Sequence, residues 1–317
     1  MSTSVWDQKD TLFVLAPMDD VTDCVFRSVV QDCAAPDIYF TEFVNVDGLQ
    51  SPGREKLLHK LRRYSSEDKV IAQLWGLNPD NFRRTASELA DMGFVGIDLN
   101  MGCPAKSEVR NGACSALILN RPLATDIIKA TQEGAGDLPV SVKTRLGYND
   151  IDLTWHEFLL SQKLDALTIH WRTKREMSKV PAHWEYAEQI VQMRDKISPR
   201  TKIIGNGDVM TRQQGLQLAE QYKLDGIMIG RGVFHDPYVF ADTSPWSSLT
   251  PDAKVALYRT HVERFADTWQ AGERKVITLN KFCKLYINGF DGAKELRERL
   301  MAARSTDELL SILNPSP

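Results

Sequence analysis

This sequence lacks the features that would place it in a membrane, outside the cell or around a metal ion. No apolar run approaches the ~18 residues that a membrane-spanning helix needs. The N-terminal stretch MSTSVWDQKD has neither the basic region nor the apolar segment of a secretory signal. The five cysteines, at positions 24, 33, 103, 114 and 283, form no C-x-x-C pair, which argues against a zinc site or a disulfide framework. We therefore expect a cytoplasmic protein without a bound metal.

An excess of one charge is also missing. Over 317 residues the net charge is −3, with 43% hydrophobic and 26% charged residues, so the composition is that of an ordinary globular protein. The charges are unevenly distributed, because residues 274–304 carry eight basic and three acidic side chains. Such a stretch is either a binding face for a polyanion or a solvated helix surface. Charge alone leaves both interpretations open.

What the sequence does contain is a repeated strand–helix pattern. Amphipathic helical patterns such as 78–93, with Asn78 as its cap, and 211–226, with Thr211 as its cap, lie between short apolar runs. The runs are continuous, as is typical of parallel strands buried on both faces. They occupy residues 12–16, 37–43, 70–75, 95–100, 139–146, 166–170, 202–206 and 226–230. Eight such units over roughly 240 residues predict a (β/α)8 TIM barrel, with a doubly wound sheet as the second choice.

The pattern changes near residue 243. The segment 241–252 is rich in Ser, Thr and Pro, and helix-like stretches follow it to the end of the chain. We predict an α/β TIM-barrel catalytic domain over residues 1–243, followed by a small all-helical domain over residues 246–317.

Polar and glycine-rich clusters follow the predicted strands, at the end where barrel enzymes carry their chemistry. The last two clusters, NGD and GRG, stand where barrels bind phosphate through backbone N–H groups and a helix N-terminus. A lysine inside the strand VSVKT is hard to explain as core, because a buried lysine needs a partner. Together the clusters predict a site for a phosphorylated cofactor with a large polar ring. Their members are Pro17, Met18, Asp19, Glu42, Gln73, Asn100, Cys103, Lys143, Arg145, His170, Arg172, Asn206, Gly207, Asp208, Gly230, Arg231 and Gly232.

Several short motifs occur in a fixed order along the chain. They are APMDDVTDCVFR, DLNMGCPAK, NGACSAL, VSVKTRLG, IHWRT, IGNGDV and IMIGRG, followed by KFCKLYINGFDGAKELR. In order and spacing this set resembles the tRNA-dihydrouridine synthases, over nearly the whole chain. The resemblance implies a barrel that binds FMN, uses NADPH as reductant and saturates the 5,6 double bond of uridines in folded tRNA. The FTEFV segment and the overall length slightly resemble the bacterial class C type, which acts on position 16.

The same resemblance implies roles for individual residues. Asn100 and Arg145 would meet the uracil, and Cys103 would protonate it. Hydride addition to carbon 6 of uracil leaves negative charge on carbon 5 and the carbonyl, and a thiol with a pKa near ~8.5 is mostly protonated at neutral pH. Cys103 should therefore not be strongly activated. The predicted cofactor-binding residues are Pro17, Met18, Asp19, Gln73, Lys143, His170, Asn206, Gly207, Asp208, Gly230 and Arg231.

The other cysteines are predicted to serve packing. Cys24, Cys33 and Cys283 lie in helical patterns, and free cysteine is among the most buried residue types. Cys114 stands where the family usually carries a small residue, which also favours packing.

Three further residues keep more than one interpretation. Asp19 either caps the next helix or serves the cofactor through its backbone, and Glu42 either orients a substrate or forms a structural salt bridge. Trp171 replaces the glycine that the family usually carries after its histidine, so we expect it to narrow the pocket or to stack on a ligand. The segment 175–184 also departs from the family's loop, which leaves its contacts to RNA open.

These observations predict an FMN-dependent, NADPH-using tRNA-dihydrouridine synthase. Its expected partner is tRNA, with no membrane and no protein partner, and nothing in the sequence demands more than a monomer. One rival is an FMN barrel reductase of a small pyrimidine or enone, against which the basic helical tail argues. The other is an RNA-binding protein without chemistry, against which the intact set Asn100, Cys103, Lys143, Arg145 and His170 counts.

Overall fold

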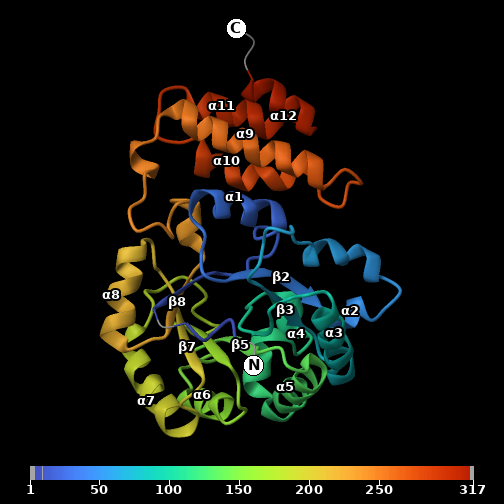
Figure 1. Ribbon diagram of the computed structural model, residues 1–317, viewed down its shortest axis with the longest axis vertical. Helices are drawn as coiled ribbons and strands as arrows, with labels where there is room; N and C mark the ends of the chain where they lie inside the picture. The colour runs from blue at the N-terminus through green and yellow to red at the C-terminus, as the bar shows by residue number, and fades with distance from the viewer. Residues whose placement is uncertain (1–3, 9, 315–317) are drawn as a thin grey trace.

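The computed structural model describes residues 4–8 and 10–314, and its centre is a barrel of eight parallel strands (Figure 1). Every predicted strand is present, within two residues of its predicted bounds. The strands are β1 (Leu12–Leu15), β2 (Tyr39–Asn45), β3 (Val70–Trp75), β4 (Gly96–Met101), β5 (Val140–Arg145), β6 (Ala166–His170), β7 (Lys202–Asn206) and β8 (Gly226–Ile229). The predicted (β/α)8 fold is confirmed, and the doubly wound alternative is wrong.

The sheet runs in the order β1-β8-β7-β6-β5-β4-β3-β2. β1 pairs with β8 along its whole length, from Leu12 opposite Gly226 to Leu15 opposite Ile229. At the joint between β1 and β2 there is one isolated bridge, in which Val14 of β1 lies opposite Ile38, the residue just before β2. This joint is therefore the least hydrogen-bonded seam of the barrel.

The strands bury side chains on both faces, because successive residues of a strand point to opposite sides. One core fills the inside of the barrel and the other lies between the strands and the surrounding helices. Along β3, for example, Ile71 belongs to the inner core, whereas Ala72 and Leu74 belong to the outer one. This double burial explains why the strand sequences are continuous apolar runs.

Helices follow the strands and cover the outside of the barrel (Figure 1). Asn78 caps its helix by accepting a hydrogen bond from the Asp80 N–H at 3.0 Å, and Thr211 accepts from the Gln214 N–H at 3.1 Å, so both predicted caps are confirmed. The predicted helix 211–226 is too long, because Gly226 already begins β8. The helices are α1 (Cys24–Ala34), α2 (Val46–Leu49), α3 (Pro79–Asp91), α4 (Lys106–Arg110), α5 (Arg121–Ala135), α6 (Leu153–Leu160), α7 (Ala187–Ile197) and α8 (Arg212–Tyr222).

The C-terminal helices follow the barrel and pack over α1, at the top of Figure 1. They are α9 (Pro251–Thr268), α10 (Asn280–Tyr286), α11 (Ala293–Ala302) and α12 (Thr306–Leu313). The Phe26 ring of α1 lies 4.8 Å from the Phe282 ring and 5.7 Å from the His261 ring. Arg264 donates to the Ser28 hydroxyl at 3.0 Å. Aromatic packing and hydrogen bonds therefore anchor these helices on the barrel.

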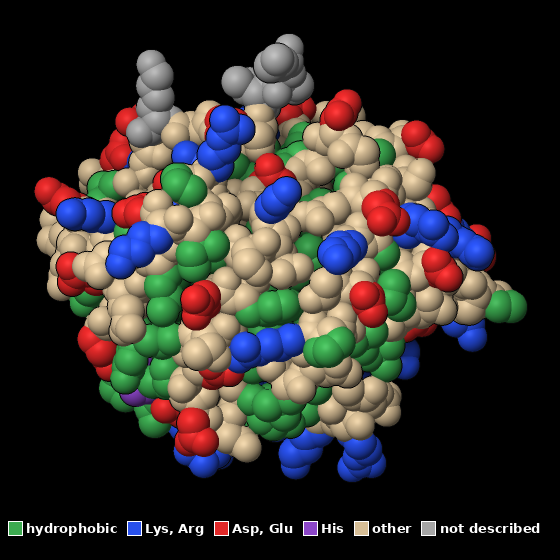
Figure 2. All heavy atoms as spheres, turned by 90° about the horizontal axis from the view of Figure 1, so that it is seen from below, with side chains coloured by type: hydrophobic (Ala, Val, Ile, Leu, Met, Phe, Trp, Pro, Cys, Tyr) green, Lys and Arg blue, Asp and Glu red, His purple; other side chains and the backbone are tan. Residues whose placement is uncertain are grey.

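Within the described residues, no helix is long and apolar enough to span a bilayer. On the face turned away from the C-terminal helices, basic and acidic side chains are interspersed (Figure 2). Cys24, Cys114 and Cys283 are buried and Cys33 is half-buried, all as free thiols, which agrees with their predicted role in packing.

Candidate active site

Polar side chains from four neighbouring strands meet at the carboxyl end of the barrel. Asn100 on β4 lies opposite Lys143 on β5. Arg145 on β5 lies opposite His170 on β6, which in turn lies opposite Asn206 on β7. The spacing of two residues puts Lys143 and Arg145 on the same face of their strand. The structure thus brings together five residues that the sequence singled out in four separate motifs.

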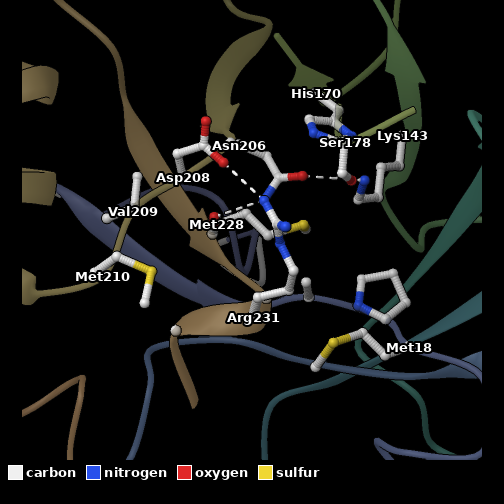
Figure 3. Close-up of a pocket in the computed structure, with 15 residues that line it drawn as sticks. Met18, Lys143, His170, Ser178, Asn206, Asp208, Val209, Met210, Met228 and Arg231 are labelled. Atoms are coloured by element: carbon white, nitrogen blue, oxygen red, sulfur yellow. Dashed lines mark hydrogen bonds and ion pairs between the residues drawn. The ribbon is translucent and has the colours of Figure 1, made fainter. Parts of the chain in front are cut away.

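An open pocket of about 190 Å³ lies beside this layer (Figure 3). Most of the predicted cofactor-binding residues line it, together with residues outside that prediction, Ser178 and Met228 among them. The lining residues are Ala16, Pro17, Met18, Lys143, His170, Ser178, Asn206, Gly207, Asp208, Val209, Met210, Met228, Gly230, Arg231 and Gly232. Among the residues that the structure describes, no three His, Cys, Asp or Glu side chains are arranged to hold a metal ion.

Lys143 projects into the pocket next to Ser178 and His170 (Figure 3). Its Nζ donates one long hydrogen bond, of 3.4 Å, to Asn206 Oδ1. The Asn206 amide is fixed in turn, because its Nδ2 donates to the Met228 carbonyl at 2.8 Å. Burial, followed by repulsion from Arg145, lowers the pKa of Lys143 to about 8. An ammonium group with one long hydrogen bond to the protein is stabilised by a ligand that is anionic or rich in hydrogen-bond acceptors.

His170 is a neutral imidazole in this setting. Burial lowers its pKa well below the ordinary value, and the positive charges of Arg145, Lys143 and Arg172 add to the effect. Arg172 Nη1 lies 3.1 Å from His170 Nε2. Because a guanidinium only donates, His170 accepts at Nε2 and carries its proton on Nδ1.

The glycine-rich turn after β7 positions an arginine at the edge of the pocket. Gly207 has φ 141° and Asp208 has φ 54°, both in the left-handed region. The Asp208 carboxylate accepts from Arg231 Nη2 at 2.7 Å and from the Ala182 N–H at 3.0 Å, and it also pairs with Arg172. With three donors its oxygens are occupied by protein groups. Asp208 therefore holds Arg231, whose side chain is 58% exposed and is available to an anion such as a phosphate.

Asn100 builds the turn that presents Cys103. Its Oδ1 accepts from the N–H groups of Gly102 at 3.1 Å and Cys103 at 2.9 Å, and its Nδ2 donates to Gln73 at 3.2 Å. Gly102 has no room for a side chain, since a Cβ there would lie 3.2–3.3 Å from backbone atoms of β5. The Cys103 turn therefore lies directly on the strand that carries Lys143.

The Cys103 thiol has a second thiol as its neighbour. Cys114, buried at φ 54°, is the main influence that lowers the pKa of Cys103. The Ala105 N–H adds to this effect and burial opposes it. The pKa of Cys114 rises in return. Cys103 is thus more acidic than we expected, and Cys114 does more than pack.

Arg145 connects the Cys103 turn to the loop after β6. Its Nε donates to the Gly102 carbonyl at 2.7 Å, and its Nη1 donates to the carbonyls of Thr173 and Met177 at 3.1 and 3.0 Å. Burial lowers its pKa to about 10, so it is charged at neutral pH. Its Nη2 makes no hydrogen bond to the described residues and remains available to a ligand.

Two predicted cofactor-binding residues lie off the pocket wall. The exposed Asp19 pairs with Lys60. Gln73 is fully buried and does not line the pocket; its Nε2 donates to Asp98 Oδ2 at 2.7 Å. Asp98 also accepts from Ser141 at 2.6 Å, and burial raises its pKa to about 6. Asp98 is not among the predicted site residues, although a carboxylate inside the apolar run VGIDLN is the same kind of signal as the strand lysine.

Trp171 does not narrow the pocket, so that prediction is wrong. It is fully buried outside the barrel, with its ring 5.5 Å from the Trp184 ring. Gly205 on the adjacent strand provides the space, because a Cβ there would lie 3.0 Å from Trp171 and 2.7 Å from Trp184. The residue next to the inward-facing His170 must point outward.

The basic stretch 274–304 is not a uniform surface. Arg274 is 7% exposed and pairs with Glu42, so Glu42 belongs to a structural salt bridge. Lys281 and Lys284 are exposed. With Lys254 they line an open pocket between the barrel and the C-terminal helices.

Comparison with known proteins gives the family of this chain. The family model described as dihydrouridine synthase matches residues 14–315. A probable tRNA-dihydrouridine synthase of Staphylococcus aureus (strain COL) is 44% identical over 318 residues, which cover 99% of this chain and 96% of the relative. Probable tRNA-dihydrouridine synthase 2 of Bacillus subtilis (strain 168) is 44% identical over 306 residues, which cover 95% and 93%.

Solved structures with a similar fold include 2-naphthoyl-CoA reductase in complex with 2-naphthoyl-CoA, with a TM-score of 0.57, 11% identity, and coverage of 76% of this chain and 50% of that one. Histamine dehydrogenase from Rhizobium sp. 4-9 gives a TM-score of 0.54 at 14% identity, with coverage of 80% and 48%. At such identities the likeness supports the barrel fold alone. The family model and the full-length relatives support more: this chain belongs to the dihydrouridine synthase family.

Proposed function

We propose that this chain reduces the 5,6 double bond of uridines in tRNA to dihydrouridine, with FMN in the pocket and NADPH as the reductant. Family membership and the names of the full-length relatives support the reaction. The observation that carries the proposal is the polar layer at the carboxyl end of the barrel. There the Cys103 turn lies on the strand whose Lys143 faces the pocket.

The residues around the pocket fit FMN. Lys143 has one long hydrogen bond and suits the polar edge of the ring, while Arg231 and the Gly207 turn suit the phosphate. Pro17, Met18, Asn206 and Gly230 complete the wall. His170 serves as a neutral hydrogen-bonding group, and Asp19 and Gln73 act from outside the wall. Bound FMN, once reduced, supplies a hydride for carbon 6 of the uracil.

Around the uracil, Cys103 gives its proton to carbon 5. The Nη2 of Arg145, which has no hydrogen bond to the described residues, would stabilise the negative charge that develops on the carbonyl. The Oδ1 of Asn100 holds the Cys103 turn, so its part in binding uracil falls to Nδ2. The lowered pKa of Cys103 eases proton release, and it also ionises a larger share of the thiol as the pH rises.

For the RNA, we propose that residues 1–243 form the catalytic domain and residues 246–317 the RNA-binding domain. Lys254, Lys281 and Lys284, at their junction, supply positive charge for phosphates. The uracil would leave its stack to reach the pocket. We further propose a cytoplasmic monomer. The class C assignment, and with it position 16, stays a prediction.

The experiment combines a spectrum with nucleoside analysis. Purified protein should show the absorbance of bound flavin, and incubation with NADPH and unmodified tRNA should add two hydrogen atoms to uridine by mass spectrometry. The tRNA fragment that has gained two hydrogen atoms would identify the position of the modified uridine.

Flavin without that gain would favour the reductase of a small pyrimidine or enone, or the chemically silent RNA binder. Absence of flavin even after reconstitution with FMN would remove the proposed cofactor site.

A further inference from the structure

The loop between β1 and α1 forms one wall of the pocket and is closed by its own hydrogen bonds. Ala16, Pro17 and Met18 line the pocket. The Thr22 hydroxyl accepts from the Met18 N–H at 2.9 Å and donates to the Met18 carbonyl at 3.2 Å. Asp20 lies at the tip of this closed turn with φ 55°. Whatever holds Asp20 therefore also places Met18.

The Asp20 backbone is held from two sides. Its N–H donates to Glu42 Oε1 at 2.7 Å, and its carbonyl accepts from Lys281 Nζ at 2.8 Å. Glu42 is fully buried on β2, whereas Lys281 is exposed on α10. The C-terminal helices thus contact the pocket loop directly.

A second connection from the C-terminal region passes through Glu42. Arg274, between α9 and α10, pairs with Glu42 Oε2, and its Nε lies 3.4 Å from Asp23 Oδ2. Its guanidinium also lies over the Trp269 ring, 5.3 Å from the centroid. A buried carboxylate needs a charged or hydrogen-bonding partner. Arg274 therefore pairs with Glu42 and orients it, so that its other oxygen accepts from the Asp20 N–H.

We propose that Arg274 and Lys281 are positioning residues for the pocket. They hold the Asp20 peptide, one through Glu42 and one directly, and so fix the wall that Met18 forms. The C-terminal helices then set the affinity of the pocket for its ligand, besides any contact they make with RNA. The contacts among these residues do not depend on the proposed function. Only the identification of the ligand as FMN rests on it.

Two lysines of α10 give a matched first test. Lys281 and Lys284 are both exposed and line the same junction, and only Lys281 contacts Asp20. Lys281→Ala should accelerate hydrogen exchange in the peptide covering 16–23 and weaken FMN binding, each by up to about tenfold. Lys284→Ala should change neither. Equal effects of the two variants, or no effect of Lys281→Ala, would overturn the direct contact.

Two arginines give the second test. Arg274→Gln should accelerate the same exchange and weaken FMN binding by about tenfold or more, since Glu42 loses its charged partner. Arg274→Lys keeps the positive charge, so hydrogen exchange at 16–23 and FMN affinity should stay close to those of the wild type. Arg264→Gln breaks another anchor of the C-terminal helices, to Ser28 and Asp32, and should lower Tm while leaving exchange at 16–23 and FMN affinity unchanged. If it weakens FMN binding as much as Arg274→Gln does, the effect is one of general docking and the proposal fails.

The exchange measurement needs no ligand. If the wild-type protein binds no FMN, the proposed cofactor is wrong, and the comparison of exchange rates at 16–23 still decides whether Arg274 and Lys281 position the loop.

Discussion

The two ends of the barrel interior are built from the same strands and differ in chemistry. On β3, Ile71 belongs to the apolar inner core, and two residues later Gln73 carries a buried hydrogen bond. On β7, Ile204 gives way in the same manner to Asn206. A step of two residues along a strand keeps the inward direction and changes the role of the side chain. The apolar end stabilises the barrel, whereas the polar end holds groups that are costly to bury and that a ligand would satisfy.

The largest effect should come from the polar end. Cys103→Ala removes the proposed proton donor, so dihydrouridine formation should fall by about 10²–10⁴-fold, while flavin content and NADPH oxidation persist. Single-turnover assays with unmodified tRNA measure this. A wild-type rate in the variant would show that another group donates the proton.

At the apolar end the effect should fall on stability. Phe40 is fully buried in the inner core, and Phe40→Ala should lower the free energy of unfolding by about 3–5 kcal/mol, with the activity of the folded fraction unchanged. Urea denaturation and activity at low temperature test both parts. A selective loss of activity in the folded fraction would contradict the separation of the barrel interior into a stabilising apolar end and a functional polar end.

Replacing the lysine of the polar end should separate stability from function most directly. Lys143→Met removes a charge that burial disfavours, so the free energy of unfolding should stay the same or rise by about 1 kcal/mol. FMN affinity should fall by about tenfold or more. Denaturation of the FMN-free protein measures the free energy of unfolding, and fluorescence titration with FMN measures the affinity. A variant that is clearly less stable would mean that Lys143 serves the fold.

A smaller effect should appear in the pH profile. Cys114 lowers the pKa of Cys103, and a proton donor loses activity as the pH rises through its pKa. In Cys114→Ala the pKa of Cys103 rises, so activity should persist to higher pH than in the wild type. Cys283→Ala, which changes a buried cysteine in the C-terminal helices, is the control and should leave the profile in place. A shift to lower pH would contradict the proposed influence of Cys114.

The smallest effect should come from the surface. Lys284→Glu should weaken tRNA binding a few-fold and reduce its dependence on salt, because phosphate contacts release counterions. Lys196→Glu, on the outside of the barrel in α7, should have little effect. Binding measured at several salt concentrations compares the two, and equal results would make the junction an ordinary solvated surface.

The elements of the barrel were predictable because parallel strands buried on both faces must be continuous apolar runs. Residues at strand ends could then be placed near each other, and Lys143, His170 and Asn206 do line one pocket. The alternation of side chains along a strand also predicts the position of Trp171, next to an inward-facing histidine.

Other features lie beyond what a sequence pattern carries. The ion pair of Glu42 with Arg274 joins residues 232 positions apart, and no periodicity links them. The contact between Cys103 and Cys114 depends on the path of a loop. Such pairs are set by tertiary packing, which single-residue propensities do not encode.

The β1–β2 seam bears on what the folding unit is. One isolated bridge joins β1 to the residue just before β2, and Arg274 contacts Asp23, which follows β1, as well as Glu42 on β2. The C-terminal region is therefore a noncovalent cross-link over the weakest joint of the barrel. A fragment ending at residue 243 would keep two buried carboxylates without their arginine, and two strand edges with little to hold them together. We expect such a fragment to open at this seam and aggregate, because the two proposed domains would then depend on each other to fold.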